Sequence, residues 1–158
     1  MEKKRNRLNK EDALEALKKY CAYQERSHNE VRTRLLEYQV YGDDLEDIMA
    51  ELISEDFLNE ERFAKTYARG KFRMKKWGKM KILQELKRRN ISDYCIRKAM
   101  KEIPLDEYES TLFTLLEKKN SFINTKNIFE RRKKLTAFAQ SKGYEFEWIN
   151  RVMNEILS

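Results

Sequence analysis

Positive charge is concentrated in one short stretch, residues 67–82, which reads YARGKFRMKKWGKMKI. Lysines and arginines alternate there with aromatic residues and methionines, and no acidic residue interrupts them. Because like charges repel, such a stretch is unfavourable unless its charges face water or an anionic partner. Basic side chains around an aromatic ring can bind phosphates and stack on a base, or enter an acidic protein groove. We therefore expect a binding surface here, with a merely solvated helix face as the alternative.

The charge extends over a wider segment. Residues 62–89 contain twelve lysines and arginines and one acid, Glu85, whereas the whole chain carries a net charge of +7. Just before it, residues 43–61 contain nine acids and no base. A second basic run, residues 118–134, has seven bases and one acid, Glu130. Clustered charge of this kind attracts polyanions and steers association.

Residue types that support catalysis are scarce. The only histidine, His28, lies beside a predicted helix start, where a surface position is expected. The chain has no Cys/His spacing typical of zinc, no glycine-rich phosphate loop and no alternating acids of a calcium loop. Cys21 and Cys95 lie far apart within helical patterns and are expected to be reduced and packed. These observations predict a binding protein rather than an enzyme, with no metal and no cofactor.

The elements that must position the basic stretch are all predicted to be helices. One proline and four glycines in 158 residues leave few interruptions, and 41% hydrophobic residues can form a core. No apolar run is long enough to span a membrane, and the charged N-terminus does not resemble a secretory signal. Helix starts are predicted from capping residues. These are Asn9, Ser27 with Glu30, Asp43 or Asp44, Asn59, Ser92, and a capping box from Asp106 to Glu109.

The helical pattern returns three times. It predicts three tandem three-helix repeats of about 50 residues in an elongated, curved array, since one such unit buries too little surface to be stable alone. A basic arm, 1–10, precedes repeats at 11–57, 58–104 and 105–158. Apolar residues set the expected equivalences between repeats. Val31, Leu35, Ile48 and Leu52 match Ile82, Leu86, Ile96 and Met100, and Gly42, Leu45, Ile48 and Leu52 match Gly143, Phe146, Ile149 and Met153.

A helical wheel assigns the faces of the helix predicted at 59–77. Phe63, Tyr67, Gly70 and Met74 fall together and are expected in the core, with Trp77 closing the end. Phe72 falls opposite, within the basic arc, where its ring could stack or anchor. The candidate binding residues are Arg62, Lys65, Arg69, Phe72, Arg73, Lys75, Lys76, Lys79, Lys81, Arg88, Arg89, Arg131 and Arg132.

Residues 25–91 resemble the RecX family of recombination regulators. The resemblance rests on Arg26-Ser27 with Glu30, on Gly42, and most specifically on the stretch DFLNEERFAKTY at 56–67, and it is faint beyond about residue 105. Asn90 departs from it, because a glycine is expected there; a left-handed turn is still accessible to asparagine. The resemblance implies three tandem three-helix repeats, and a cytoplasmic protein that binds the RecA recombinase, in the groove of its DNA filament, and restrains its recombinase, ATPase and coprotease activities. It also implies weak, nonspecific DNA binding.

Two alternatives to a RecA regulator remain at this point. One is a stand-alone helical protein that binds nucleic acid without sequence preference. The other is a membrane-surface protein that uses the 59–77 helix, which is disfavoured because the repeat itself needs the apolar stripe of that helix. The expected protein is a monomer without membrane association.

Overall fold

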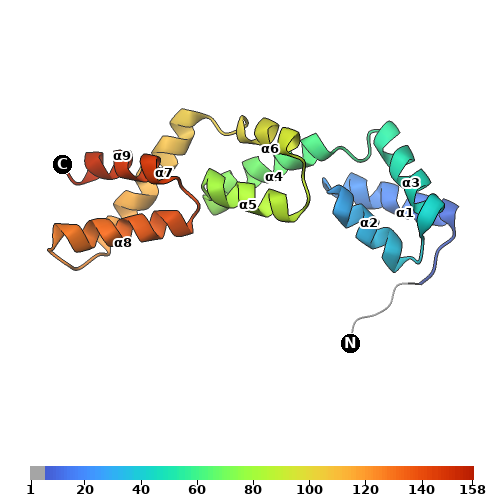
Figure 1. Cartoon of the computed structure of the whole chain (residues 1–158), viewed down its shortest axis with the longest axis horizontal. Helices are drawn as coiled ribbons and strands as arrows, with labels where there is room; N and C mark the ends of the chain where they lie inside the picture. Colours follow the sequence, from blue (N-terminus) through green and yellow to red (C-terminus); the bar gives the residue numbers. More distant parts are fainter. Residues whose placement is uncertain (1–5) are drawn as a thin grey trace.

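The computed structural model describes residues 6–158, which form nine α-helices and no strand (Figure 1). The helices follow one another in three groups of three along an elongated molecule, so the prediction of an all-α fold with three tandem three-helix repeats is confirmed. The predicted basic arm, 1–10, lies partly outside the described residues. The helices are α1 (Lys10–Tyr23), α2 (His28–Glu37), α3 (Gly42–Ser54), α4 (Glu60–Lys75), α5 (Lys79–Arg88), α6 (Asp93–Met100), α7 (Leu105–Ser121), α8 (Ile128–Ser141) and α9 (Phe146–Ile156).

Most helix starts lie where capping residues predict them. Asn9, Asn59 and Ser92 each accept a backbone N–H of the first turn, and Ser27 and Glu30 form a full capping box. Two predicted caps are wrong. Helix α3 starts at Gly42, before the aspartates, and α7 starts at Leu105 directly after Pro104. The acids of both segments lie in the first turn instead, where they favourably face the positive end of the helix.

The turns between the second and third helices show how the three repeats align. Relative to this alignment, the residue matches predicted for the third helix are wrong by three positions. Gln39, Asn90 and Gly143 each follow the second helix of their repeat in the left-handed conformation, with φ of 62°, 58° and 97°. Asn90 thus makes the turn that glycine usually makes. The residue after each turn, Val40, Ile91 or Tyr144, is buried. By these turns Leu45 corresponds to Ile96 and Ile149. A three-residue shift leaves the apolar face of a helix almost unchanged, so periodicity could not set this register.

The buried face of α4 also differs from the prediction. Phe63 is buried as expected, together with Ala64, Ala68 and Phe72, whereas Met74 is 82% exposed. The face is rotated because α4 packs mainly against α6, and the two alanines allow close approach. The wheel was drawn through the large apolar residues and gave the alanines no weight.

The buried side chains form two separate cores. Repeat 1 has one of its own, which runs from Ala13 to Leu58. Repeats 2 and 3 share the other, which runs from Phe63 to Met153 and includes residues of all six helices. Both cysteines are buried and free, one in each core, as predicted. Burial raises the pKa of the Cys21 thiol to about 11.

A ring cluster joins repeats 2 and 3. Phe72 of α4 lies 5.9 Å from the fully buried Tyr108 of α7, measured between ring centroids. Tyr108 also packs against Tyr144 at 5.0 Å and Trp148 at 5.8 Å, and its hydroxyl donates to Glu145. The backbones of the two repeats also meet beside this cluster, at Gly78 and Gly143. Only glycine fits at position 78, because a Cβ there would lie 2.3 Å from the carbonyl carbon of Gly143. The second and third repeats therefore form one packed unit.

Candidate functional site

Several of the predicted binding residues are neutralised inside the molecule. Arg62 lies 2.6 Å from Glu25 and 3.1 Å from Asp56, and Lys65 and Arg69 both reach Glu102. At the end of α5, Arg88 and Arg89 share Glu85. Five of the twelve basic residues from position 62 to 89 are therefore paired with acids of the chain itself.

The other seven bases of this segment have no acidic partner within residues 6–158. Six of them gather where α4 ends and α5 begins: Lys71, Arg73, Lys75, Lys76, Lys79 and Lys81. We call these six residues and Trp77 the α4–α5 corner. Arg73, Lys75 and Lys76 are exposed, and the other three lysines are half-buried. The corner therefore presents positive charge that the rest of the described chain does not neutralise.

An aromatic ring lies at the centre of this corner. The side-chain nitrogens of Lys71 and Lys81 lie 5.0 Å and 4.7 Å from the ring centroid of Trp77, within reach of a cation–π interaction. This contact keeps two positive charges beside a partly buried ring. Such a combination can bind a phosphate or a carboxylate next to a planar or apolar group.

Repeat 3 fixes the backbone of the corner. The Tyr144 hydroxyl donates to the carbonyl of Lys76 at 2.9 Å, and the amide of Gly78 donates to the carbonyl of Lys142 at 2.7 Å. The amide of Lys79 donates to the Tyr108 hydroxyl at 2.9 Å. Lys76 itself ends α4 in the left-handed conformation, with φ of 60°. The charged turn is thus held by residues 29 to 68 positions away in the sequence.

The proposed role of Phe72 as an exposed ring is wrong. Its side chain is 3% exposed and packs on Tyr108. Phe72 anchors α4 to repeat 3 and so positions the corner from within. The exposed face that the wheel gave to Phe72 is taken by charged residues, and the ring beside the free lysines is that of Trp77.

The candidates in the second basic run have local partners. Arg131 donates two hydrogen bonds to Asn120 near the end of α7 and two to carbonyls of the loop that follows, and Arg132 donates to Asn150 and Asn154 of α9. Neither residue lies in the α4–α5 corner. The sequence prediction therefore combined two distinct regions of repeats 2 and 3.

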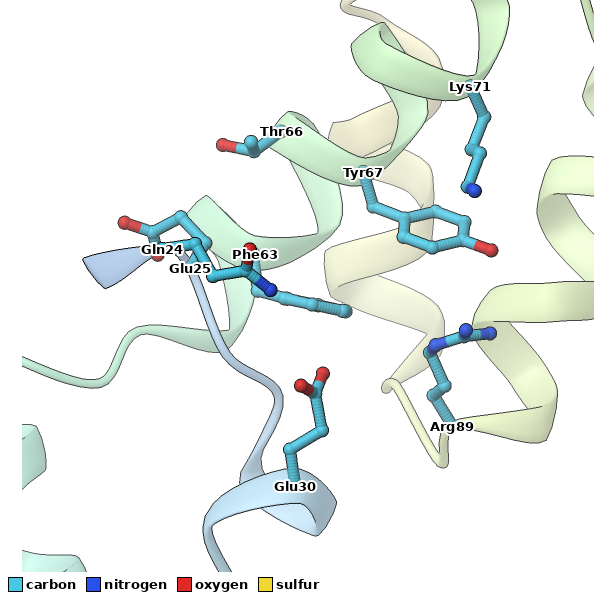
Figure 2. Close-up of a pocket in the computed structure, with 8 residues that line it drawn as sticks. All are labelled: Gln24, Glu25, Glu30, Phe63, Thr66, Tyr67, Lys71 and Arg89. Atoms are coloured by element: carbon cyan, nitrogen blue, oxygen red, sulfur yellow. The ribbon is translucent and has the colours of Figure 1, made fainter. Parts of the chain in front are cut away.

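A cleft between repeats 1 and 2 was not expected from the sequence. It has a volume of about 440 Å³, and Figure 2 shows its lining residues. Tyr67 lies between Lys71 and Arg89, whose charged groups are 5.4 Å and 4.8 Å from its ring centroid. Burial raises the pKa of Tyr67, and the positive charge of Arg89 opposes this shift. The opposite wall carries Glu25 and Glu30, from a different repeat.

The acids of the cleft are already engaged. Glu25 is paired with Arg62, and Glu30 accepts the amide and hydroxyl protons of Ser27. Its walls come from residues 24–30 and 63–89, which lie in different repeats, and this is why periodicity within one helix could not reveal it. The cleft adjoins the α4–α5 corner through Lys71.

Residues 6–158 contain no group of three or more His, Cys, Asp or Glu side chains that could hold a metal ion. No helix in this range is long and apolar enough to cross a membrane.

Two domains of a known protein family match this chain. The second three-helix domain of RecX matches residues 59–100, and the third matches residues 106–153, which together exceed half of the chain. The chain belongs to the RecX family. The third repeat, in which the resemblance was faint, is thus a recognisable RecX domain.

Individual RecX proteins are distant relatives. Regulatory protein RecX of Bacillus cytotoxicus is 23% identical over 137 residues, which are 87% of this chain and 51% of that protein. Regulatory protein RecX of Clostridium perfringens is 26% identical over 133 residues, which are 83% of this chain and 62% of that protein. The chain therefore spans about half the length of the Bacillus relative.

Solved RecX structures share the fold. The crystal structure of RecX from Lactobacillus salivarius superposes with a TM-score of 0.86 at 22% identity, over 92% of this chain and 95% of that chain. A second structure, of a regulatory protein RecX, gives a TM-score of 0.82 at 18% identity, over 92% and 71% of the two chains. The arrangement of helices is thus common to RecX proteins of low sequence identity.

Proposed function

We propose that this protein binds the RecA recombinase and its filaments on DNA, and inhibits their recombinase, ATPase and coprotease activities. The observation that carries the proposal is the α4–α5 corner, where six bases lack an acidic partner within residues 6–158 and two of them, Lys71 and Lys81, lie beside the ring of Trp77. Membership of a family of regulatory proteins supports a binding role rather than catalysis.

The chemistry of the corner suits a filament that carries both phosphates and acidic side chains. Lysine and arginine neutralise either kind of anion, and their contacts with phosphates carry no sequence information. An elongated protein whose second and third repeats form one unit can lie along a groove without rearranging. The protein is proposed to act as a cytoplasmic monomer and to bind bare DNA only weakly.

The decisive test is the single-strand-dependent ATPase of RecA from the same organism, with this protein titrated from far below stoichiometry. We expect inhibition at a small fraction of the RecA concentration. The triple variant Arg73→Glu, Lys75→Glu, Lys81→Glu is expected to need at least about tenfold more protein for half-inhibition, because it reverses charge at the contact. Its circular dichroism should match that of the wild type.

A matched control separates the corner from net charge. Lys19, Lys87 and Lys101 are exposed and have no acidic partner within residues 6–158, and their reversal to glutamate changes the net charge equally. We expect this control to inhibit nearly as well as the wild type. Equal loss in both triple variants would show that only overall charge matters.

Salt dependence distinguishes the proposal from simple nucleic-acid binding. If about five phosphates are neutralised, affinity for bare single strands falls with a log–log slope of roughly −3.5 in salt. A filament bound partly through protein contacts should show a shallower slope. An identical steep slope on bare strands and on filaments, with no effect on the ATPase, would establish a stand-alone DNA-binding protein instead.

A further inference from the structure

The loop between α7 and α8 carries exposed apolar side chains at the end of the molecule far from repeat 1 (Figure 1). Phe122 is 70% exposed, Phe129 75% and Ile128 57%. Single exposed apolar residues are ordinary, but three around one six-residue loop form a patch. We call Phe122, Ile128, Phe129 and the segment 123–127 between them the α7–α8 tip.

The repeat architecture does not require this loop. Four residues, 24–27, join the first two helices of repeat 1, and three residues, 76–78, join those of repeat 2. Repeat 3 uses six, 122–127. Ile123 of this loop packs against the shared core, whereas Phe122 in the loop and Ile128 and Phe129 at the start of α8 are exposed to water.

The loop is nevertheless held in one conformation. The Arg131 guanidinium donates to the backbone carbonyls of Asn120 at 2.9 Å, Ile123 at 3.1 Å and Thr125 at 2.7 Å, and to the Asn120 side chain at 2.6 Å. The Thr125 hydroxyl donates to Glu130 at 2.9 Å. An arginine fork that satisfies three carbonyls fixes the path of the chain. The apolar side chains are therefore displayed on an ordered support.

Positive charge surrounds the tip. Lys118, Lys126 and Lys133 are exposed, Lys119 is half-buried, and none has an acidic partner within residues 6–158. The one acid of residues 118–134, Glu130, accepts from Thr125. The complementary surface is therefore apolar at its centre and acidic at its rim. This is the usual arrangement of a protein interface, with anchors inside and charges outside.

We propose that the α7–α8 tip is a second docking element, which inserts Phe122 and Phe129 into an apolar pocket with an acidic rim on a protein partner. A protein pocket is favoured over stacked nucleic-acid bases because the aliphatic Ile128 shares the patch and an ordered loop suits a preformed pocket. Repeats 2 and 3 share one core, so the tip and the α4–α5 corner are held at a fixed separation. Two sites on one rigid body bind cooperatively when the partner presents both complements.

The partner tested is the RecA filament on single-stranded DNA, so this inference rests on the proposed function. The variant is Phe122→Ser with Phe129→Ser, and both positions are exposed enough to leave the unfolding midpoint unchanged. The control is Leu36→Ser with Ile53→Ser, two exposed apolar residues of repeat 1. We expect the tip variant to bind filaments at least about tenfold more weakly. The control should bind filaments like the wild type, and bare single strands should bind all three proteins equally.

A third variant tests whether the order of the loop matters. Arg131→Lys keeps the charge but cannot donate to all the acceptors of the fork. We expect it to weaken filament binding in the same direction as the tip variant, and to increase hydrogen exchange only around residues 120–127. Normal binding with increased exchange would show that the ordered loop is not needed. It would overturn the proposal that the α7–α8 tip binds as a preformed element.

The outcomes separate the two proposals. If the wild type does not bind or inhibit filaments, the proposed function fails and the docking partner fails with it. If the wild type binds and the tip variant binds equally well, this inference alone is wrong. Equal losses on filaments and bare strands would make the tip a base-stacking site. Binding to vesicles with about one-third anionic lipid, lost in the tip variant, would make it a membrane anchor.

Discussion

The two junctions between repeats are built from opposite chemistry. Between repeats 2 and 3, Tyr108 lies fully buried among aromatic rings, and two glycines allow the backbones to touch. Between repeats 1 and 2, the contacts that join the elements are ion pairs, chiefly Arg62 with Glu25 at 2.6 Å. His28 lies 4.0 Å from Glu60 across the same junction. The core of repeat 1 stops at Leu58, and no residue belongs to both cores.

The difference shows how one repeat unit can be joined rigidly or loosely. Burial of aromatic surface is not weakened by ionic screening, and it excludes other arrangements because displaced rings leave a cavity. A half-exposed ion pair contributes little and is screened by salt. Repeats 2 and 3 are therefore expected to unfold together, and repeat 1 separately. The two proposed binding surfaces, the α4–α5 corner and the α7–α8 tip, both lie on the unit formed by repeats 2 and 3.

The largest expected effect is that of Tyr108→Ala. Loss of a buried ring at the centre of the cluster should cost about 3–5 kcal/mol of stability. Both tryptophans, Trp77 and Trp148, pack against the shared core, so their fluorescence reports repeats 2 and 3. In urea, the fluorescence transition should move to lower denaturant while part of the circular dichroism transition stays in place.

The matched substitution in the other core is Leu35→Ala, in a residue that is fully buried in repeat 1. It should shift the part of the dichroism transition that reports repeat 1 to lower urea concentration, and it should leave the fluorescence midpoint unchanged. Equal displacement of both signals in both variants would mean that the chain unfolds as a single unit, and the contrast between junctions would be lost.

A smaller effect is expected from Tyr144→Phe. The substitution keeps the buried ring but removes the hydrogen bond from its hydroxyl to the Lys76 carbonyl. We expect a loss of about 0.5–1.5 kcal/mol, measured as a shift of the fluorescence midpoint in urea. Tyr23→Phe, at a side chain that is 83% exposed, is the control and should change nothing. A midpoint unaffected by Tyr144→Phe would indicate that water replaces the hydroxyl.

The smallest effect is expected at the polar junction. Arg62→Gln removes the pairs with Glu25 and Asp56 and should cost roughly 1 kcal/mol or less, seen in the dichroism transition of repeat 1. The cost should shrink between about 20 mM and about 500 mM salt, because salt screens the pairs. Arg73→Gln, at an exposed base that pairs with no acid of residues 6–158, is the control. A loss from Arg62→Gln that persists at high salt would argue for a packing role of the guanidinium instead.

The sequence predicted where the excess charge lies but not which of its bases are paired, as individual residues show. Charge density pointed to residues 67–82, and six bases there have no acidic partner in the part of the chain that the structure describes. It could not show that Arg62 is held by Glu25 or that Lys65 and Arg69 share Glu102, because those acids lie 33 to 37 residues away. Phe72 was misplaced because the wheel assumed one buried face on α4, whereas α6 and Tyr108 of α7 both pack on that helix.

The sequence by itself determined the helices, most of their caps, the threefold repetition and the location of excess charge. These follow from local rules: side-chain periodicity, capping hydrogen bonds and the order of charged residues along the chain. Only the tertiary structure decided which face of α4 is buried, which bases are neutralised, and that repeats 2 and 3 share one core while repeat 1 has its own. Those features depend on contacts between distant segments, such as Tyr144 with Lys76, and local pattern carries no information about them.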